Sequence, residues 1–563
     1  MRGMSVKRIL AATIVAVPSV LLAQAAATKP DVDTVFARYS KSTPGCAVGV
    51  EQNGVPTLAK GYGMADLEHD VPITPDTIFE AGSVTKQFTA AAVLLLARDG
   101  KLSIDDPVRK YIPELPDYEK TGAPASPQTD GGPLLIRHML NHTSGLRDWG
   151  GVASIAGWPR TTRVHTHAHV LEIVSHQQSL NFPPGSNWSY SNTGFNLAAI
   201  LVSRVSGQSF PTFTAERIFK PLGMSHTSWR DDYTRIVKNR AIAYLEDREH
   251  KGEFKTDMPF ENVYGNGGLL TTVGDLLKWN ENFDEPVVGD RAFVELQQQP
   301  GKFNDGRTHG YAFGLYVGNR EGLREVYHSG STAGYSAFLT RFPDQKLSIA
   351  VLCNVATNAT ALAHGVADQY LGITTRAPMA TYTVTDADIS RLVGMYRNIA
   401  LGGAQTIVRG ENGNGLRIEN GPLLLATAPN QFVLPTGARL SFDGNGKGTV
   451  TDEFGTVEHL ERLPRANPPA TELSAYEGVY ASSEAEVELR AAVENGQLVL
   501  KRRPATTIVL TPLYADAFSA PGLGTIVFHR DTNQRPIEFV VSQERVWALR
   551  FGRKEKEGTG TKN

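Results

Sequence analysis

Two strand-like hairpins frame residues 34–372, and a helix-rich stretch separates them along the chain. The first covers residues 47–62 around the turn Asn53-Gly54, and the second covers residues 337–354 around Pro343-Asp344. Strands at the two ends of this segment can share a sheet only if the chain folds back so that the last hairpin lies beside the first. The pattern therefore predicts an α+β domain, in which one antiparallel sheet joins both hairpins and helices cover it.

After residue 372 the pattern changes. Residues 373–388 are expected to be a linker, and short alternating strands with frequent turns follow it. The segments that begin at Ile389 and Leu473 resemble each other, with Ser, Gly and Tyr at matching places. We predict two small all-β barrel-like domains, at 389–466 and 467–556, and a disordered tail at 557–563. The alternative is one larger β domain in which the internal match is a coincidence.

The first residues have the pattern of an export signal. Arg2, Lys7 and Arg8 precede an apolar run at 9–22, and an A-x-A cleavage signal ends at Ala25. The apolar run is shorter than the roughly 20 residues that a spanning helix needs. We expect a signal peptide at 1–25 and a periplasmic or secreted protein, without stable membrane insertion after cleavage. The alternative is an uncleaved anchor.

Charge and cysteine content exclude several classes. Lys and Arg total 56 and Asp and Glu total 58, a net charge of −2 that gives no general attraction to nucleic acid. Two cysteines, Cys46 and Cys353, exclude a disulfide scaffold and a four-cysteine zinc site. Export would permit a disulfide between them, but both lie in apolar strand-like runs, and we favour two buried free thiols.

Ser83 and Lys86 are the first candidates for chemistry, at the start of a long apolar helix-like stretch. Their i, i+3 spacing places both side chains on one helical face. A serine is a weak nucleophile until a base takes its proton, and a desolvated lysine can serve as, or tune, that base. The alternative is an ordinary first helical turn, since a chain of this composition contains about one S-x-x-K by chance.

Two further motifs carry candidate groups, Tyr190-Ser-Asn192 and His328-Ser-Gly-Ser331. Tyr190 could anchor its loop or, near a cationic lysine, ionise more easily and act as a base, and Asn192 could orient a substrate amide or that lysine. Gly330, two residues after His328, would let a substrate backbone approach closely. The N–H of Ser331 would pair with that of Ser83 in an oxyanion hole. The alternative for this last motif is a polar turn before a strand.

The histidine clusters do not predict a metal site, and we expect no metal or cofactor. His165, His167 and His169 alternate, but the valines around them indicate the start of a helix, where residues i and i+2 diverge. His138 and His142 have a metal-like spacing without the glutamate of H-E-x-x-H. We expect His142 to brace its loop through hydrogen bonds.

Taken together, S-x-x-K, Y-x-N and H-x-G in this order resemble the serine β-lactamase and penicillin-recognising enzyme superfamily, in its class C-related branch. The resemblance implies a β-lactamase/transpeptidase-like fold for residues 26–372 and lipocalin-like modules for the two β domains. Flanking blocks in the family order support it, at residues 79–86, 136–146, 184–194, 267–275 and 328–335.

The resemblance also implies roles for the candidate residues. Ser83 would be the nucleophile and Lys86 would assist its activation. Tyr190 would be the general base toward Ser83 and then toward water, and Asn192 would position Lys86 and the substrate. The oxyanion would lie between the backbone N–H groups of Ser83 and Ser331.

His328 departs from the class C β-lactamases, which have the lysine of K-T-G at this place. A histidine is neutral for much of the time near pH 7, so binding of a substrate carboxylate should weaken here. We therefore expect an acyl-enzyme hydrolase of small-molecule or peptide substrates, with D-amino-acid amides, peptides or esters favoured over efficient β-lactam hydrolysis. The alternatives are a true class C-like β-lactamase, a D-Ala-D-Ala carboxypeptidase, or a non-catalytic receptor for penicillin or peptidoglycan fragments. The sequence does not predict the oligomeric state.

Overall fold

The computed structural model describes residues 30–118, 132–160, 162–373, 382–410, 415–452 and 455–555. The expected signal peptide and C-terminal tail lie outside the described residues, as does the middle of the expected linker. Within the part that is described, no helix is both long enough and apolar enough to cross a membrane.

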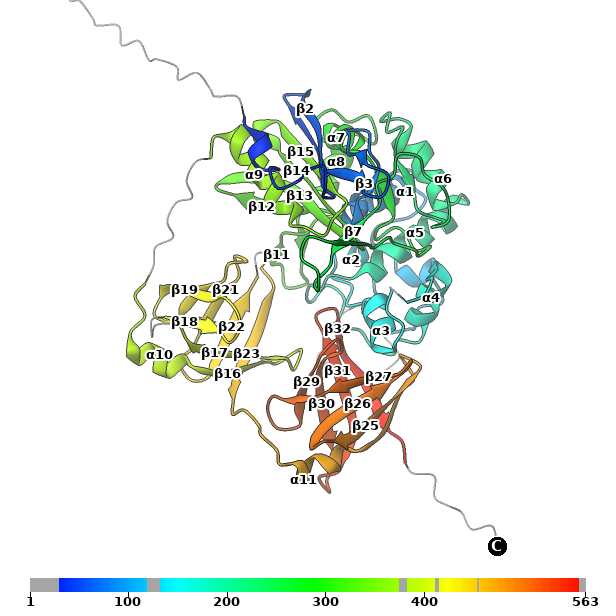
Figure 1. The fold of residues 1–563 in the computed structure, drawn as a ribbon. Helices are drawn as coiled ribbons and strands as arrows, with labels where there is room; N and C mark the ends of the chain where they lie inside the picture. The colour runs from blue at the N-terminus through cyan, green and yellow to red at the C-terminus, as the bar shows by residue number, and fades with distance from the viewer. Residues whose placement is uncertain are drawn as a thin grey trace, which may run out of the picture.

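A six-stranded antiparallel sheet is the centre of the α+β unit, by which we mean residues 30–373 (Figure 1). The first and last hairpins meet at its middle, where β1 pairs with β15 along its whole length, so the predicted pairing is confirmed. In sheet order the strands are β12 (Tyr316–Arg320), β13 (Leu323–Thr332), β14 (Tyr335–Phe342), β15 (Leu347–Cys353), β1 (Cys46–Gln52) and β2 (Val55–Tyr62).

Helices cover both faces of this sheet. Alternate residues of a strand point to opposite faces, and β15 shows this directly. Ile349 and Val351 belong to the apolar cluster that contains residues of α9 (Ala359–Leu371). Ala350 and Leu352 belong to the larger cluster that contains residues of α7 (Val273–Glu281), α1 (Lys86–Arg98) and α5 (Asn192–Ser206).

The shorter elements of the α+β unit lie around this core. The helices are α2 (Ile136–Leu140), α3 (Trp149–Ile155), α4 (His167–Ser175), α6 (Phe210–Thr214) and α8 (Arg291–Gln297), and the 3-10 turn η2 (Gly82–Thr85) precedes α1. The short strands are β3 (Met64–Asp66), β4 (Val71–Pro72), β5 (Phe79–Glu80), β6 (Ser228–Trp229), β7 (Tyr244–Glu246), β8 (Phe254–Thr256), β9 (Leu269–Thr271), β10 (Gly301–Lys302) and β11 (Thr308–His309).

Cys46 and Cys353 form a disulfide, so the expectation of two free thiols is wrong. The pairing of β1 with β15 places the two residues directly opposite each other, with a Cα–Cα distance of 4.0 Å. Both apolar runs are buried strands as expected, but strand register, which neither run reveals alone, brings the two sulfurs together.

A closed eight-stranded barrel, the first barrel, follows the α+β unit after the short helix α10 (Asp386–Leu392). Its own apolar side chains, Leu416, Leu424 and Phe432 among them, fill the interior. The strands are β16 (Gly394–Asn398), β17 (Ala404–Arg409), β18 (Leu416–Ile418), β19 (Leu423–Ala428), β20 (Gln431–Val433), β21 (Arg439–Phe442), β22 (Lys447–Thr451) and β23 (Val457–Leu463).

A nine-stranded antiparallel sheet, the second barrel, begins after α11 (Ala470–Leu473). The expected α+β fold followed by two barrel-like units is thus confirmed. The strands are β24 (Gly478–Ser482), β25 (Val487–Glu494), β26 (Gln497–Arg502), β27 (Thr506–Val509), β28 (Thr511–Pro512), β29 (Ala517–Ala520), β30 (Gly524–Arg530), β31 (Pro536–Gln543) and β32 (Val546–Arg553).

The internal sequence match has a structural counterpart at its shared tyrosine. In the first barrel, Tyr396 donates a hydrogen bond of 3.0 Å to the carbonyl of Leu392. In the second, Tyr480 donates one of 2.9 Å to the carbonyl of Tyr476. Both bonds join the first strand of a barrel to the short helical segment four residues earlier, so the two units begin in the same way.

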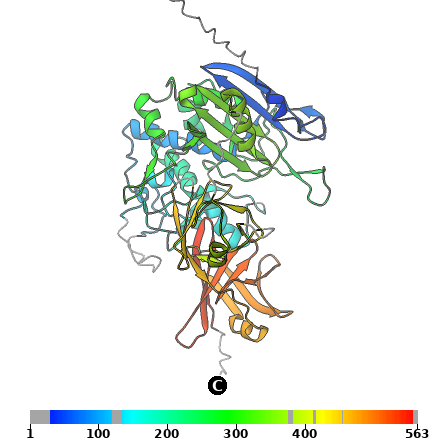
Figure 2. The ribbon, with the colours of Figure 1, turned by 90° about the vertical axis from the view of Figure 1, so that its left-hand side faces the viewer.

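The second barrel contacts the α+β unit through the hairpin of β31 and β32, whose tip reaches the region of α3 (Figures 1 and 2). The main-chain N–H of Asp148 donates to the carbonyl of Arg545 at 3.1 Å. The Asn181 side chain accepts from the N–H of Trp547 at 2.9 Å. A loop of the second barrel is therefore held against the segments that surround the start of α5.

Candidate active site

The turn after β5 brings Ser83 and Lys86 together. Ser83 lies in η2 and Lys86 is the first residue of α1, so the chain changes from 3-10 to α-helix between them. Lys86 Nζ lies 3.0 Å from Ser83 Oγ, and the lysine side chain is fully buried. The contact expected from the i, i+3 spacing is thus present in the structure.

Lys86 Nζ has two more polar neighbours, and both are carbonyl oxygens. It donates to Asn192 Oδ1 at 2.9 Å and to the main-chain oxygen of Asn266 at 2.7 Å. Burial holds the pKa of Lys86 well below its usual value, and the positive charge of Arg545 lowers it further. The Lys86 side chain therefore favours the neutral amine more than an exposed lysine does.

Tyr190 lies in the loop before α5, at the same cleft. Lys86 Nζ is 4.8 Å from the centre of its ring, and the guanidinium carbon of Arg545 is 4.6 Å from it. Burial raises the pKa of Tyr190 above its usual value, while the hydrogen bond with Ser83 and the charge of Arg545 oppose that rise. The cation that lowers this pKa is Arg545 and not the expected lysine, and desolvation is the larger effect, so the phenol does not ionise more easily than usual.

Asn192 and Asp148 connect this loop to the second barrel. Asn192 begins α5, and its N–H donates to Asp148 Oδ2 at 2.8 Å. Asp148 Oδ1 caps α3 by accepting from the N–H of Gly150, and the Asp148 N–H donates to Arg545. The carboxylate thereby fixes the start of the helix that presents the Asn192 amide to Lys86.

Glycines allow η2 and β13 to touch through their backbones. A Cβ atom at Gly82 would lie 2.5 Å from the nitrogen of Ser331, and one at Gly330 would lie 2.0 Å from the oxygen of Ala81. The backbones of Ser83 and Ser331 are therefore neighbours at the cleft, as an oxyanion hole requires. Gly330 lines the cleft, and the absence of a side chain there makes room for the contact between the two backbones.

His328 is buried on β13 and has a defined tautomer. Its Nδ1 lies 2.6 Å from the carbonyl oxygen of Ser329, which can only accept, so Nδ1 carries the proton. Its Nε2 then accepts from the hydroxyl of Tyr311 at 2.9 Å. Burial lowers the pKa of His328 to about 3, and the nearby Lys86 contributes to the shift. The histidine at the K-T-G place is therefore a neutral group.

His142 braces the loop of Tyr190. Its Nδ1 accepts from the N–H of Ser191 at 3.2 Å, and its carbonyl accepts from the N–H of Ser189 at 3.1 Å. Its ring centre lies 4.2 Å from that of Tyr190. The hydrogen bonds expected for His142 are thus present, and they fix the main chain on both sides of the tyrosine.

Of the three alternating histidines, His165 and His169 have neighbouring rings, with centres 5.9 Å apart, and His167 contacts other groups. His167 and His169 lie in the first turn of α4, whereas His165 precedes it. The His167 ring contacts the main chain of Tyr264, and His169 Nδ1 accepts from the N–H of Thr166. The helix start predicted from the valines accounts for the separation of His167 from its neighbours at i−2 and i+2.

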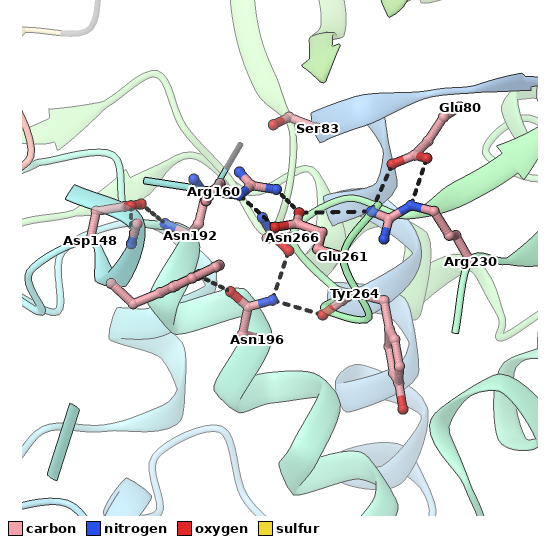
Figure 3. A network of polar contacts seen from close by, with 12 residues as sticks. Glu80, Ser83, Asp148, Arg160, Asn192, Asn196, Arg230, Glu261, Tyr264 and Asn266 are labelled. Atoms are coloured by element: carbon pink, nitrogen blue, oxygen red, sulfur yellow. Dashed lines mark hydrogen bonds and ion pairs between the residues drawn. The ribbon is translucent and has the colours of Figure 1, made fainter. Parts of the chain in front are cut away.

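A buried polar network lies beneath the site (Figure 3). Asn196 donates to the side-chain oxygen of Asn266 at 2.7 Å and to the carbonyl of Tyr264 at 2.8 Å. These bonds hold the main chain at Asn266, whose carbonyl accepts the hydrogen bond from Lys86. Glu80, three residues before Ser83, accepts two hydrogen bonds from the buried guanidinium of Arg230. The network thus fixes the backbone on both sides of the lysine amine.

The site opens into a cleft of about 670 Å³ to which all three parts of the chain contribute. Asp452 comes from the first barrel, and Glu544 and Arg545 come from the tip of the β31–β32 hairpin. The sequence-predicted residues that line it are Ser83, Tyr190, Asn192, His328, Gly330 and Ser331. Lys86 lies behind them.

Sequence reasoning missed Asn266, Tyr311, Asp148 and Arg545. Asn266 directly precedes one of the matching blocks, so its position was a usable signal. No sequence pattern pointed to Arg545. It lies far from Ser83 in the sequence, in a β domain whose role the sequence does not indicate.

Comparisons with known proteins agree with this geometry. A sequence model of the family described as Beta-lactamase matches residues 29–370. Penicillin-binding protein 4* of Bacillus subtilis is 29% identical over 307 residues, which cover 52% of this chain and 64% of that protein, so the chain spans less than two thirds of that relative. The D-aminopeptidase of Gluconobacter oxydans is 26% identical over 508 residues, covering 86% of this chain and 91% of that protein.

Solved structures show the same fold. The octameric penicillin-binding protein homologue of Pyrococcus abyssi superposes with a TM-score of 0.53 at 24% identity, covering 75% of this chain and 96% of that one. The D-amino acid amidase of Ochrobactrum anthropi, solved with L-phenylalanine amide, superposes with a TM-score of 0.50 at 20% identity, covering 61% and 97%. The expected β-lactamase/transpeptidase-like fold is thereby confirmed.

Proposed function

This chain belongs to the Beta-lactamase family, and from that premise we propose that it is a serine hydrolase that acts through an acyl-enzyme on amide and ester carbonyls. The observation that carries the proposal is the contact of 3.0 Å between Ser83 Oγ and the buried amine of Lys86. The relatives named D-aminopeptidase and D-amino acid amidase support D-amino-acid amides and peptides as the substrate class.

The hydrogen-bond pattern around Lys86 supports this amine as the first proton acceptor. A neutral amine has two N–H groups and one lone pair. The oxygens of Asn192 and Asn266 are acceptors only, so together they take both N–H groups. The lone pair then faces the hydroxyl of Ser83, which is the geometry of a general base. The resemblance assigns this step to Tyr190, but the raised pKa of that phenol favours its protonated form.

The reaction then follows in balanced steps. Ser83 Oγ loses its proton to Lys86 and bonds to the substrate carbonyl carbon, whose oxygen becomes an oxyanion near the N–H groups of Ser83 and Ser331. The carbon–nitrogen bond breaks as the Tyr190 hydroxyl protonates the leaving amine, and Lys86 returns a proton to Tyr190. Water next attacks the ester and gives one proton to the Lys86–Tyr190 pair. Ser83 Oγ regains a proton as the acid leaves.

The neutral His328 supports amide and ester substrates over β-lactams. The class C β-lactamases that this chain resembles have a lysine at the position of His328, and that fixed cation favours binding of a β-lactam carboxylate. A histidine with a pKa of about 3 supplies no such charge at neutral pH. We expect D-alanine p-nitroanilide and p-nitrophenyl acetate to react faster than nitrocefin. A nitrocefin rate far above both would contradict this interpretation.

The test of the nucleophile is Ser83→Ala, which should abolish turnover and covalent labelling by a fluorophosphonate. Ser203→Ala on α5, whose hydroxyl donates to the carbonyl of Ala199 in the same helix, is the matched control and should retain both. Hydrolysis that persists in Ser83→Ala would overturn the assignment. Intact mass spectrometry of the penicillin-treated wild type tests the receptor alternative, because a hydrolase clears its adduct whereas a receptor holds it for hours.

We also propose that the chain is exported with residues 1–25 as its signal. The support is the sequence pattern alone, a basic start followed by an apolar run and Ala23-Gln24-Ala25. N-terminal sequencing of the protein recovered after expression in a bacterium should begin at Ala26. A mature chain that retains Met1 would contradict the proposal.

A further inference from the structure

Arg545 enters the cleft from the second barrel on a fixed main chain. Its carbonyl accepts from the N–H of Asp148 at 3.1 Å and from the side-chain amide of Asn181 at 3.2 Å. Asn181 also accepts from the N–H of Trp547, so one amide holds the main chain at Arg545 and at the start of β32. The backbone is anchored independently of the guanidinium, whose position therefore follows from the docking of the hairpin.

The Arg545 guanidinium is not neutralised by a hydrogen-bonded acid in the described structure. Its Nε is buried and has no hydrogen-bond partner there. The acid paired with it is Glu544, at 3.7 Å from Nε, and that side chain is 83% exposed. The other cations at the site differ, since Arg160 forms a two-bond pair with Glu261, and Lys86 has three close polar neighbours. Arg545 thus has charge and donors available for an anion.

The position beside Tyr190 identifies which half of a substrate would meet this cation. Tyr190 is the proposed donor to the leaving group, and the Arg545 guanidinium carbon lies 4.6 Å from the centre of its ring. A group attached just beyond the scissile bond would therefore approach Arg545. His328 faces the same cleft and is neutral, so it provides no competing charge there.

We propose that Arg545 binds the carboxylate of a leaving group that is an α-amino acid, so that the second barrel supplies a specificity determinant of the active site. This inference rests on the proposed function, and it names the substrate class as short peptides whose scissile bond is followed by a free carboxylate. A guanidinium suits this role because its planar donors match both carboxylate oxygens. Glu544 and Asp452 also line the cleft and disfavour anions at a distance, so selection depends on direct contact with the guanidinium.

The test compares two peptides that differ only in this charge, D-alanyl-glycine and D-alanyl-glycinamide. We expect the wild type to cleave the free carboxylate form with a kcat/KM about 10- to 100-fold higher, the range of one charge-assisted hydrogen-bonded pair. Arg545→Gln should remove most of this preference, and Arg545→Lys should retain part of it, because it keeps the charge but loses the two-donor geometry.

Arg550→Gln is the matched control, because this arginine lies on the same hairpin and its guanidinium pairs with Glu538 at the surface. It should leave both rates as they are in the wild type. Equal rates for the two peptides, no cleavage of either, or a loss in Arg545→Gln that is the same for both would each overturn the proposal. Fluorophosphonate labelling of Ser83 in every variant separates these results from a failure of the proposed function, which would appear as loss of labelling in the wild type.

Discussion

The guanidinium of Arg147 and the carboxylate of Glu484 form a buried ion pair across the contact between the α+β unit and the second barrel. Arg147 Nη1 lies 2.5 Å from Glu484 Oε2, and the two side chains are 1% and 6% exposed. Arg147 also donates to the carbonyl of Trp547, and Glu484 accepts from the N–H of Gln178. Because Trp547 follows Arg545 so closely, this pair fixes the hairpin that reaches into the cleft.

Breaking this pair should strongly destabilise the docked state. Glu484→Ala leaves the Arg147 charge buried without its acid, which costs about 3–5 kcal/mol in comparable cases. We expect calorimetry to show a lower unfolding temperature, or a separate early transition for the second barrel. Glu494→Ala is the control, since its ion pair with Lys501 lies exposed on the same barrel, and it should change stability by less than about 1 kcal/mol. A wild-type melting profile for Glu484→Ala would show that the contact does not hold the units together.

The disulfide gives a second prediction about stability. A link between Cys46 and Cys353 closes almost the whole α+β unit into one loop, with a sequence separation of 307 residues. Removing it through Cys46→Ala together with Cys353→Ala should lower the free energy of unfolding by about 2–5 kcal/mol. In the wild type, a thiol assay under denaturing and non-reducing conditions should detect no free thiol. Detection of two would restore the interpretation as buried free cysteines.

Local patterns in the sequence identified much of this molecule. Hairpin turns predicted the strands that pair at the centre of the sheet, and the repeated tyrosine segments at Tyr396 and Tyr480 indicated two similar barrels. The spacing of Ser83 and Lys86 placed them on one turn, because such contacts depend only on helical geometry. The turns and the Ser83–Lys86 contact rest on residues close together in the chain, whereas the pairing of the two hairpins followed from their places at the two ends of one segment.

Side-chain contacts between distant segments could not be predicted in this way. The Cys46–Cys353 bond depends on strand register, and the place of Arg545 depends on how one hairpin of the second barrel docks. The pKa of Tyr190 is a similar case, because burial raises it while the hydrogen bond with Ser83 and the charge of Arg545 lower it, and only the packed structure shows which effect is larger. The proposed function therefore followed from the motifs, whereas the role proposed for Arg545 required the assembled chain.

The roles of Lys86 and Tyr190 can be separated by the leaving group. If Tyr190 donates a proton to the leaving amine, Tyr190→Phe should slow an anilide about 100- to 10,000-fold. A p-nitrophenyl ester should slow far less, because p-nitrophenolate leaves without a proton. Single-turnover kinetics on both substrates would measure this. An equal loss on both would instead support Tyr190 as the base toward Ser83.

The pH dependence of acylation should report Lys86. The amine must be neutral to accept the Ser83 proton, so kcat/KM should fall as pH drops through the pKa of Lys86. Because burial lowers that pKa well below its usual value, activity should persist at pH values where an ordinary lysine is charged. Lys86→Arg keeps a permanent charge and should lose about 100- to 10,000-fold at every pH. An unchanged acid limb in that variant would exclude Lys86 as the base.

Gly330 tests whether the contact between η2 and β13 is needed for chemistry. A methyl group at Gly330 would lie 2.0 Å from the Ala81 oxygen and 3.0 Å from the Ser83 nitrogen, so β13 must move away from the nucleophile turn. Displacing the Ser331 N–H from the oxyanion should lower the acylation rate about 100- to 1,000-fold, the usual effect of losing one such donor.

Gly552→Ala on β32 is the control, because nothing lies within 4 Å of its added methyl group. Stopped-flow acylation with p-nitrophenyl acetate, alongside melting curves for both variants, distinguishes lost catalysis from lost folding. Normal acylation in a folded Gly330→Ala protein would show that the oxyanion is stabilised elsewhere.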